Sequence, residues 1–370
     1  MASISNPNSL SYPLPLGRQK PFPKPLKSSG TLAKFFVEDT TPVAGREFAC
    51  NIVNDVLHAT NSDEIIRDLA IEISTRGVVF FRAQDNLTDK LQKELVHRLG
   101  QLTGKPADST LHIHPVLNTS EFGVGDLEIN PVNSIIRKTI VKLAPPPTKR
   151  RSDYLSQWHS DSQYEPVPPD YTCLRLTQLP KTGGDTLWAS GYELYDRFSK
   201  PYQKFFEGLT ASCIGDGFHK YATEYPDFCS IYDKPRGNPA NKGVSLSAVH
   251  PLVRTNPVTG WKSIFAFGPF TSRINELEKQ ESDELLKKLG QMIIENHDLQ
   301  VRFKWRNEND IGQCILCRDN RSMFHTATYD YDDDKTLGER VGIRTVGIGE
   351  APYFDPDSIS RSEALFGTSG

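Results

Sequence analysis

The sequence is poor in the features that mark several protein classes. Its six cysteines are spread over 370 residues, which is not the pattern of a disulfide scaffold. It contains no run of eighteen apolar residues, so it predicts no membrane span. Its start, MASISNPNSLSYPLPLGRQKPFPKPLK, lacks the apolar stretch of a signal peptide. We therefore expect a protein of the reducing cytoplasm with no membrane partner.

An excess of charge of one sign is also missing. There are 43 lysines and arginines against 46 aspartates and glutamates, and the formal net charge is −3. This near-neutral balance argues against a nucleic-acid partner. The one basic cluster, at residues 149–151, follows three prolines and is typical of a solvated loop. A small-molecule partner is the expectation that remains.

The pattern along the chain predicts a proline-rich arm over residues 1–35 and a single domain over 36–370. Helices are expected at 61–77, 87–100 and 278–296, the first two capped by Asn61 with Glu64 and by Thr88, and ending at Gly77 and Gly100. VVFFR should form a buried strand, and RTNPVTGWKSI a hairpin. From about residue 110, short β-prone runs follow one another without regular helices between them, which favours a mostly β fold with flanking helices.

The stretch QWHSDSQYEP places His159 two residues before Asp161. On a strand, both side chains would lie on one face and could supply two ligands to a first-row metal. The same two residues could also form an acid/base pair, or be a polar pair on a loop. Two histidines and one carboxylate on one face of a metal are the pattern of non-heme Fe(II) oxygenases. The interpretation therefore depends on a third ligand.

His325 is the candidate for that third ligand. It follows CRDNRSMF and precedes two arginines, Arg340 and Arg344, in GERVGIRTVG. An even separation on a strand puts both guanidinium groups on one face, where they can bind carboxylates or sulfonates. An ordinary ion-pair network is the alternative for these two arginines.

Five motifs in order carry a resemblance to a known family. WHSD, LPKTGGDTLWAS, HPLVRTNPVTGWKSIF, RDNRSMFH and ERVGIRT together resemble the TauD/TfdA (taurine dioxygenase-like) family of Fe(II)- and 2-oxoglutarate-dependent dioxygenases, in particular its fungal members. The resemblance covers roughly residues 60 to 355. It implies a double-stranded β-helix core, also called a jelly-roll or cupin-like fold.

The resemblance also implies a set of site residues. His159, Asp161 and His325 would bind Fe(II), which 2-oxoglutarate would chelate. The distal carboxylate of 2-oxoglutarate would meet Thr186 and Arg340. O2 and 2-oxoglutarate would be consumed, with release of succinate and CO2, while an unactivated C–H bond of the substrate is oxidised.

The residues that would meet the substrate imply an anion with an apolar part. In LHIHPVL, His114 matches the histidine that contacts the sulfonate in taurine enzymes, and Arg344 would face the substrate or reinforce the co-substrate. Leu117, like Leu155, stands where those enzymes have a polar residue. We therefore expect a sulfonate or an amino or carboxylic acid with an apolar tail. A structural role is the alternative for His114.

A Cys-x-x-Cys and a long segment rich in turn-forming residues are two further features of the sequence. Cys314 and Cys317 form a Cys-x-x-Cys, but on a strand their sulfurs point to opposite faces, which favours buried thiols over zinc or redox chemistry. The long segment 214–243 predicts a lid, with His219 and Tyr221 at the entrance. The rival functions are a non-catalytic 2-oxoglutarate- or metal-binding protein of the same fold and a zinc hydrolase. The sequence leaves a homo-oligomer open.

Overall fold

The structure is a computed structural model that describes residues 21–116, 125–134, 157–226, 229–306 and 313–367. Three of the features discussed above lie outside these ranges: Leu117, Leu155 and the basic cluster 149–151.

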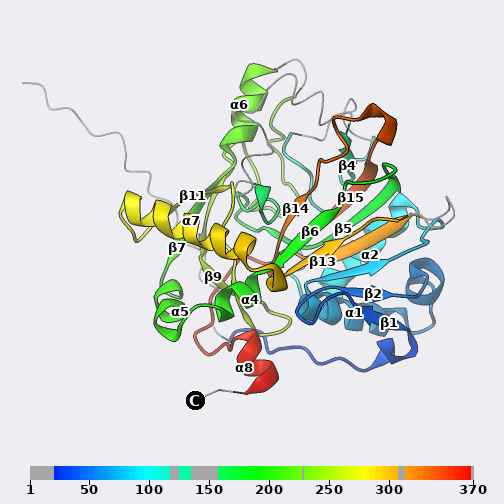
Figure 1. Cartoon of the computed structure of the whole chain (residues 1–370), viewed down its shortest axis with the longest axis horizontal. Coiled ribbons are helices and arrows are strands. Elements are labelled where there is room, and N and C mark those ends of the chain that lie inside the picture. The colour runs from blue at the N-terminus through cyan, green and yellow to red at the C-terminus, as the bar shows by residue number, and fades with distance from the viewer. Residues whose placement is uncertain (1–20, 117–124, 135–156, 227–228, 307–312, 368–370) are drawn as a thin grey trace, which may run out of the picture.

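A seven-stranded sheet forms one wall of the core, in the order β1-β2-β3-β13-β5-β15-β4 (Figure 1). Neighbouring strands are antiparallel except for the parallel pair β2 and β3. The strands are β1 (Val37–Asp39), β2 (Arg46–Phe48), β3 (Val78–Phe81), β13 (Cys314–Asp319), β5 (Pro169–Gln178), β15 (Val341–Ile348) and β4 (Asn130–Asn133).

A three-stranded sheet faces the inner side of this wall. Its order is β12 (Gln300–Phe303), β6 (Thr186–Ser190) and β14 (Met323–Ala327). The two sheets share a core in which Phe80 of β3 stacks on Phe303 of β12, with 3.9 Å between ring centroids, and meets Trp188 of β6 edge-on. This packing of sheet on sheet confirms the expected mostly β, jelly-roll fold.

Two helices cover the outer face of the large sheet: α1 (Ser62–Arg76) and α2 (Asp89–Leu102). Gly77 ends α1 with a φ of 78°, a conformation that favours glycine. The Thr88 side chain accepts from Leu91 N and caps α2 as expected. Two expectations were wrong in detail. The Asn61 side chain caps no backbone group, and α2 continues past Gly100, which lies where a Cβ would be 2.4 Å from Asp170.

Several of the remaining elements pack on the other face of the small sheet, where Ala189 of β6 and Phe324 of β14 share a core with them. The predicted hairpin is present as β9 and β10, and the third predicted helix as α7. Among the helices of the described ranges, none is long and apolar enough to cross a membrane. The elements are a sheet of β11 (Thr271–Ile274), β7 (Thr210–Ile214) and β8 (Ser247–Pro251), the hairpin β9 (Val253–Thr255) and β10 (Lys262–Ile264), and helices α4 (Gly191–Asp196), α5 (Lys200–Phe206), α6 (Asp216–Glu224), α7 (Lys279–Glu295) and α8 (Arg361–Phe366).

The described part of the proline-rich arm, residues 21–35, lies against the body. The buried carboxylate of Asp68 on α1 accepts hydrogen bonds from Ser28, Ser29 and Thr31, at 2.8 to 3.0 Å. Burial alone would raise the pKa of Asp68, but these hydrogen bonds lower it to about 2. Phe22 stacks on Tyr353 near the other end of the chain.

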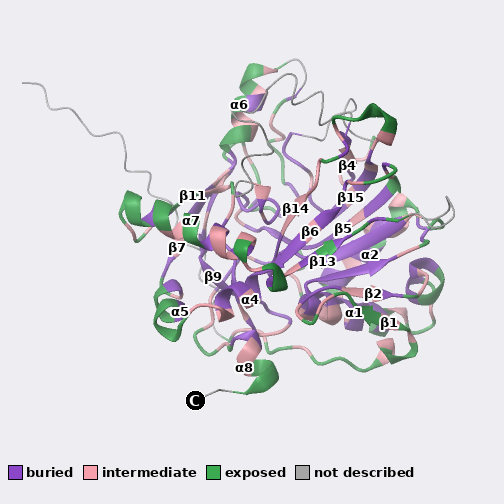
Figure 2. Cartoon of the chain, in the orientation of Figure 1, coloured by how far each residue is buried: buried purple, intermediate pink, exposed green. Residues whose placement is uncertain are grey.

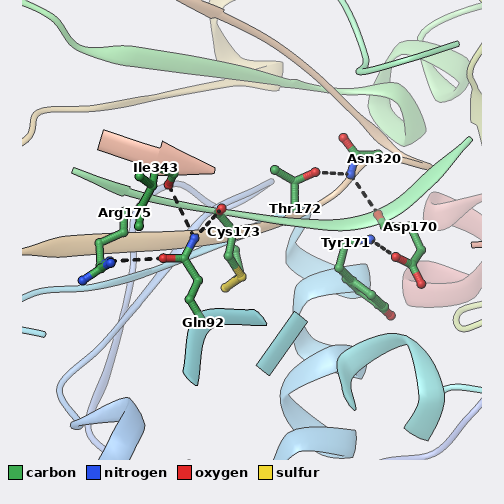
Figure 3. The surroundings of a disulfide bond; sticks show 9 residues. Gln92, Asp170, Tyr171, Thr172, Cys173, Arg175, Asn320 and Ile343 are labelled. Atoms are coloured by element: carbon green, nitrogen blue, oxygen red, sulfur yellow. Dashed lines mark hydrogen bonds between the residues drawn. A yellow bond between two sulfur atoms is a disulfide. The ribbon is translucent and has the colours of Figure 1, made fainter. Parts of the chain in front are cut away.

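One cysteine expectation was wrong. Cys317 of β13 is not a free thiol but forms a disulfide with Cys173 of β5, its direct partner in the antiparallel ladder (Figure 3). The sequence could not show this pairing, because strand register places together residues 144 positions apart. Cys314 is buried and free, and it lies in the inner core whereas Cys317 lies in the outer one, as expected. Cysteine content therefore gives no argument for a reducing compartment.

Candidate active site

A backbone bridge brings the two histidines together. His159 N donates to His325 O at 3.1 Å, and His325 N donates to His159 O at 2.8 Å. His325 lies on β14, but the stretch around His159 is a single bridge followed by a turn at 161–164, so His159 and Asp161 are not placed by a strand. The turn carries Ser162 at a φ of 50° and directs Asp161 back toward the histidines.

Three ligand atoms converge at this bridge. Asp161 Oδ1 lies 3.8 Å from His159 Nε2 and 4.0 Å from His325 Nε2, and the three residues offer ligand atoms within 4.8 Å of one another. Each ring is held through its other nitrogen: His159 Nδ1 is 2.8 Å from Gln157 O, and His325 Nδ1 is 2.8 Å from His159 O. A carbonyl only accepts, so both Nδ1 atoms carry the proton and both Nε2 lone pairs remain for a metal.

Two arginines hold the carboxylate. Arg318 of β13 donates to Asp161 Oδ2, and Arg344 Nη1 of β15 lies 3.1 Å from Oδ1 and 3.2 Å from Oδ2. Both strands flank β5, so the two side chains reach Asp161 from either side of that strand. Arg318 is buried, whereas the Arg344 side chain is 23% exposed.

The protonation states suit a cation. Burial is the largest cause that lowers the pKa of both His159 and His325, which keeps the imidazoles neutral. Burial would raise the pKa of Asp161, but Arg344 and Arg318 outweigh it and hold that pKa well below its usual range. Two neutral imidazoles and one carboxylate are the donor set of a non-heme iron site.

A second group of polar side chains lies on β6 and at the residue before β15. Thr186 Oγ1 accepts from Arg340 Nη2 at 3.2 Å and from Trp305 Nε1 at 3.1 Å, and all three residues are buried. Two donors occupy the hydroxyl oxygen, so its own proton is directed to a further acceptor. A hydroxyl and a guanidinium side by side suit a carboxylate.

A glycine turn brings Arg340 next to Thr186. Gly183 and Gly184 both have positive φ, 81° and 72°, just before Thr186. Gly184 O accepts from Arg340 Nε at 3.1 Å, and a Cβ on Gly184 would lie 3.2 Å from the Arg340 side chain. The Gly-Gly-Asp-Thr sequence therefore matters through its backbone as well as through the threonine.

Aromatic rings extend from the histidines. Phe270 meets His159 edge-on at 6.2 Å, and Phe218 of α6 meets His114 edge-on at 5.1 Å. Tyr164 contacts both phenylalanines, at 5.1 and 5.4 Å. The site therefore has an aromatic side beside its charged side.

His114 is buried within reach of the site's charges. Burial, His112 and Arg344 lower its pKa well below the usual value, while Asp161 acts in the opposite direction. Its Nδ1 accepts from Val116 N at 3.1 Å, which places the ring proton on Nε2. The local backbone bond fits the structural role that the sequence left open, and the Nε2–H donor fits a role toward an anion.

The expected lid segment contributes one ring to this cluster. Helix α6, which is mostly exposed (Figure 2), places Phe218 on the aromatic side of the site. Tyr221 packs with Val116 and Cys229, in a small cluster that Phe218 also contacts. The ring of this helix that contacts His114 and Phe270 is Phe218, and the expectation that His219 and Tyr221 line the entrance stays a prediction.

Two residues of the site were missed from sequence, Arg318 and Trp305. A signal existed for Arg318: it lies within CILCRD, a strand otherwise suited to full burial, and a buried arginine requires an acidic partner. Trp305 carried no such signal. It meets Thr186 only because β12 and β6 pair in the small sheet.

Comparison with known proteins shows the family of the chain. The family model "Taurine catabolism dioxygenase TauD, TfdA family" matches residues 37–345. Alpha-ketoglutarate-dependent dioxygenase oryG of Aspergillus oryzae is 46% identical over 352 residues, which are 93% of this chain and 96% of that protein. An alpha-ketoglutarate-dependent sulfonate dioxygenase of Saccharomyces cerevisiae is 29% identical, over 83% of this chain and 68% of that protein.

The fold has a solved counterpart as well. A taurine dioxygenase from Burkholderia xenovorans superposes with a TM-score of 0.62 at 23% identity, covering 88% of this chain and 92% of the other. The chain belongs to the TauD/TfdA family and is a dioxygenase that uses Fe(II), 2-oxoglutarate and O2.

Proposed function

We propose that His159 Nε2, Asp161 Oδ1 and His325 Nε2 bind the iron. The observation that carries this assignment is the convergence of the three atoms, with both Nδ1 protons donated to backbone carbonyls. Iron bound there supplies the activation of O2 that couples conversion of 2-oxoglutarate to succinate and CO2 with oxidation of a C–H bond. The backbone bridge fixes both rings, so the protein positions the ligands before the metal binds.

In the same proposal, Thr186 and Arg340 bind the distal carboxylate of 2-oxoglutarate. Both are buried, and a buried carboxylate is costly unless it is paired and hydrogen-bonded. Trp305 supports the pair by donating to the same hydroxyl. The Thr186 proton and the Arg340 guanidinium then meet the carboxylate from two directions.

We propose that the primary substrate is a small sulfonate or an amino or carboxylic acid with an apolar part. Arg344 and His114 supply the cationic and hydrogen-bonding side, and Phe218 and Phe270 the aromatic side. The sulfonate dioxygenase among the relatives supports an anionic group. We keep a cytoplasmic location as part of this proposal, to be checked by imaging the tagged protein.

Anaerobic titration tests the metal assignment. Adding Fe(II) and then 2-oxoglutarate to the protein should produce a weak visible charge-transfer band. Stoichiometric zinc in the purified protein, with no band after exchange into Fe(II), would support the zinc hydrolase instead.

A variant tests the carboxylate ligand. Asp161→Ala should reduce 2-oxoglutarate turnover to background while the protein still unfolds cooperatively. Unchanged turnover in this variant would remove Asp161 from the metal site.

A substrate screen tests the anionic class. Succinate release should be stimulated by members of the sulfonate, amino-acid and carboxylic-acid sets that carry apolar tails, and less by their uncharged amides or esters. Equal and negligible stimulation by every acid would contradict the proposal. A band without any stimulated turnover would indicate the non-catalytic alternative.

A further inference from the structure

The two oxygens of Asp161 have different surroundings. Oδ1 is the atom that faces the Nε2 atoms of His159 and His325, at 3.8 and 4.0 Å. Oδ2 is the atom that accepts from Arg318, while Arg344 Nη1 lies 3.1 Å from Oδ1 and 3.2 Å from Oδ2. One oxygen is thus turned toward the two imidazoles, and the other toward a strand of the large sheet.

Arg318 reaches Asp161 from a rigid position. It lies on β13, one residue after the disulfide-bonded Cys317, and its partner in the ladder is Thr172 of β5. The side chain is only 3% exposed, and Arg344 shares the carboxylate from the far side of β5. A buried arginine held in this way loses little further freedom when it holds a carboxylate.

Arg318 is also shielded from ligands. Its Nη1 has no hydrogen-bond partner in the described structure and is closed to solvent. Leaving a donor unpaired in this way costs about 1–3 kcal/mol. The Arg344 side chain, by contrast, is 23% exposed and can meet a bound molecule. Arg318 therefore acts through Asp161.

We propose that Arg318 is a positioning residue that holds Asp161 Oδ2 and so leaves Oδ1 as the single metal-binding oxygen. The inference rests on the proposed metal site. A carboxylate without this restraint is free to rotate and loses the orientation that points Oδ1 at the Nε2 atoms of the two histidines. Partners of this kind orient metal ligands, and losing one costs about 10–100-fold in metal affinity.

Mn(II) binding, followed by the loss of the electron paramagnetic resonance signal of free Mn(II), tests this role without relying on turnover. Arg318→Met should bind Mn(II) about 10–100-fold more weakly than the parent protein. Arg318→Lys keeps the charge on a shorter side chain that does not place a donor where the guanidinium Nη2 lies, and should lose about 3–10-fold. The matched control is Arg175→Met, since Arg175 is also a buried arginine of the large sheet but binds Asp89. It should bind Mn(II) like the parent.

Thermal unfolding of each variant, with and without Mn(II), separates folding from binding. Parent-like affinity in a folded Arg318→Met protein would overturn the inference. If that variant does not fold, parent-like affinity in Arg318→Lys would overturn it in the same way. Failure of the parent protein to bind Mn(II) would instead count against the proposed metal site.

Discussion

Asp161 and Glu350 each lie between two buried or half-buried arginines, yet only around Glu350 do further carboxylates offset the charge of those arginines. Glu350 accepts from Arg254 at 2.6 Å and from Arg321 at 3.0 and 3.1 Å. Asp319 and Asp170 lie 3.5 and 3.9 Å from Arg321, so two arginines face three carboxylates. All of these side chains are at most 5% exposed. This cluster is closed to solvent and has no excess of positive charge.

Around Asp161 the same arrangement is left incomplete. Arg318 and Arg344 face a single carboxylate, which leaves one positive charge in excess within the described part of the chain. The His159 side chain is 29% exposed there. A closed cluster whose arginines all face carboxylates stabilises the fold, whereas an open and positive one can receive a metal chelator and an anion. Arg318 and Arg321 serve the two clusters from only three positions apart.

The largest effect expected from this difference is on stability. Glu350→Ala leaves Arg254 and Arg321 buried without their shared partner, and should lower the free energy of unfolding by about 3–5 kcal/mol. Asp161→Ala should cost less, because the partly exposed Arg344 can turn to water. Urea denaturation of both variants checks the contrast. Equal losses would mean that the two clusters do not differ in this way.

Lowering the pH should reduce the free energy of unfolding through protonation of Glu350 in the closed cluster. Burial raises the pKa of Glu350, but Arg321 and Arg254 outweigh it and bring the pKa from 4.5 down to about 2. The unfolded chain therefore binds a proton that the folded protein does not. This contribution, on the order of 3 kcal/mol, is complete above about pH 5 and is lost as the pH falls toward 2. Urea denaturation between pH 6 and 3 should show the loss in the parent protein and a smaller one in Glu350→Gln.

Arg344 of β15 and Arg340, the residue before that strand, should affect different ligands of the open site. Arg340→Met removes a charged partner of the co-substrate and should raise KM for 2-oxoglutarate about 10–100-fold. Arg344→Met should leave that KM within about threefold and raise KM for the best acid of the substrate screen. Succinate release measures both. A common effect of the two variants on 2-oxoglutarate would assign both arginines to the co-substrate.

The smallest expected effect is at Trp305. Trp305→Phe keeps the ring against Phe303 and removes one hydrogen bond to Thr186, worth about 0.5–1.5 kcal/mol. KM for 2-oxoglutarate should rise about two- to tenfold, with little change in unfolding. No change would show that the hydroxyl is oriented without the indole.

Features set by local sequence could be predicted, and features set by strand register could not. The fold class and three helices followed from local patterns, and the triad followed from His159, Asp161 and His325 in motifs of a known family. The partners of those residues did not follow, since they depend on strand register. Register sets Cys317 opposite Cys173 and places Arg318 and Arg344 on either side of β5. RDNR shows two arginines, and nothing local says which one faces the site.

The arm described above has a practical consequence for cutting the chain. Residues 21–35 tie α1 to the far end of the molecule: Ser28 to Thr31 cap Asp68, Leu26 N donates to Val258 O, and Phe22 covers Tyr353. A truncation at residue 36, chosen because the composition changes there, would strip a buried carboxylate of its donors. An expression variant shortened at the N-terminus should therefore keep the chain from Pro21 onward. A protease cut between residues 22 and 30 should weaken the contacts of the arm with α1 and with Tyr353.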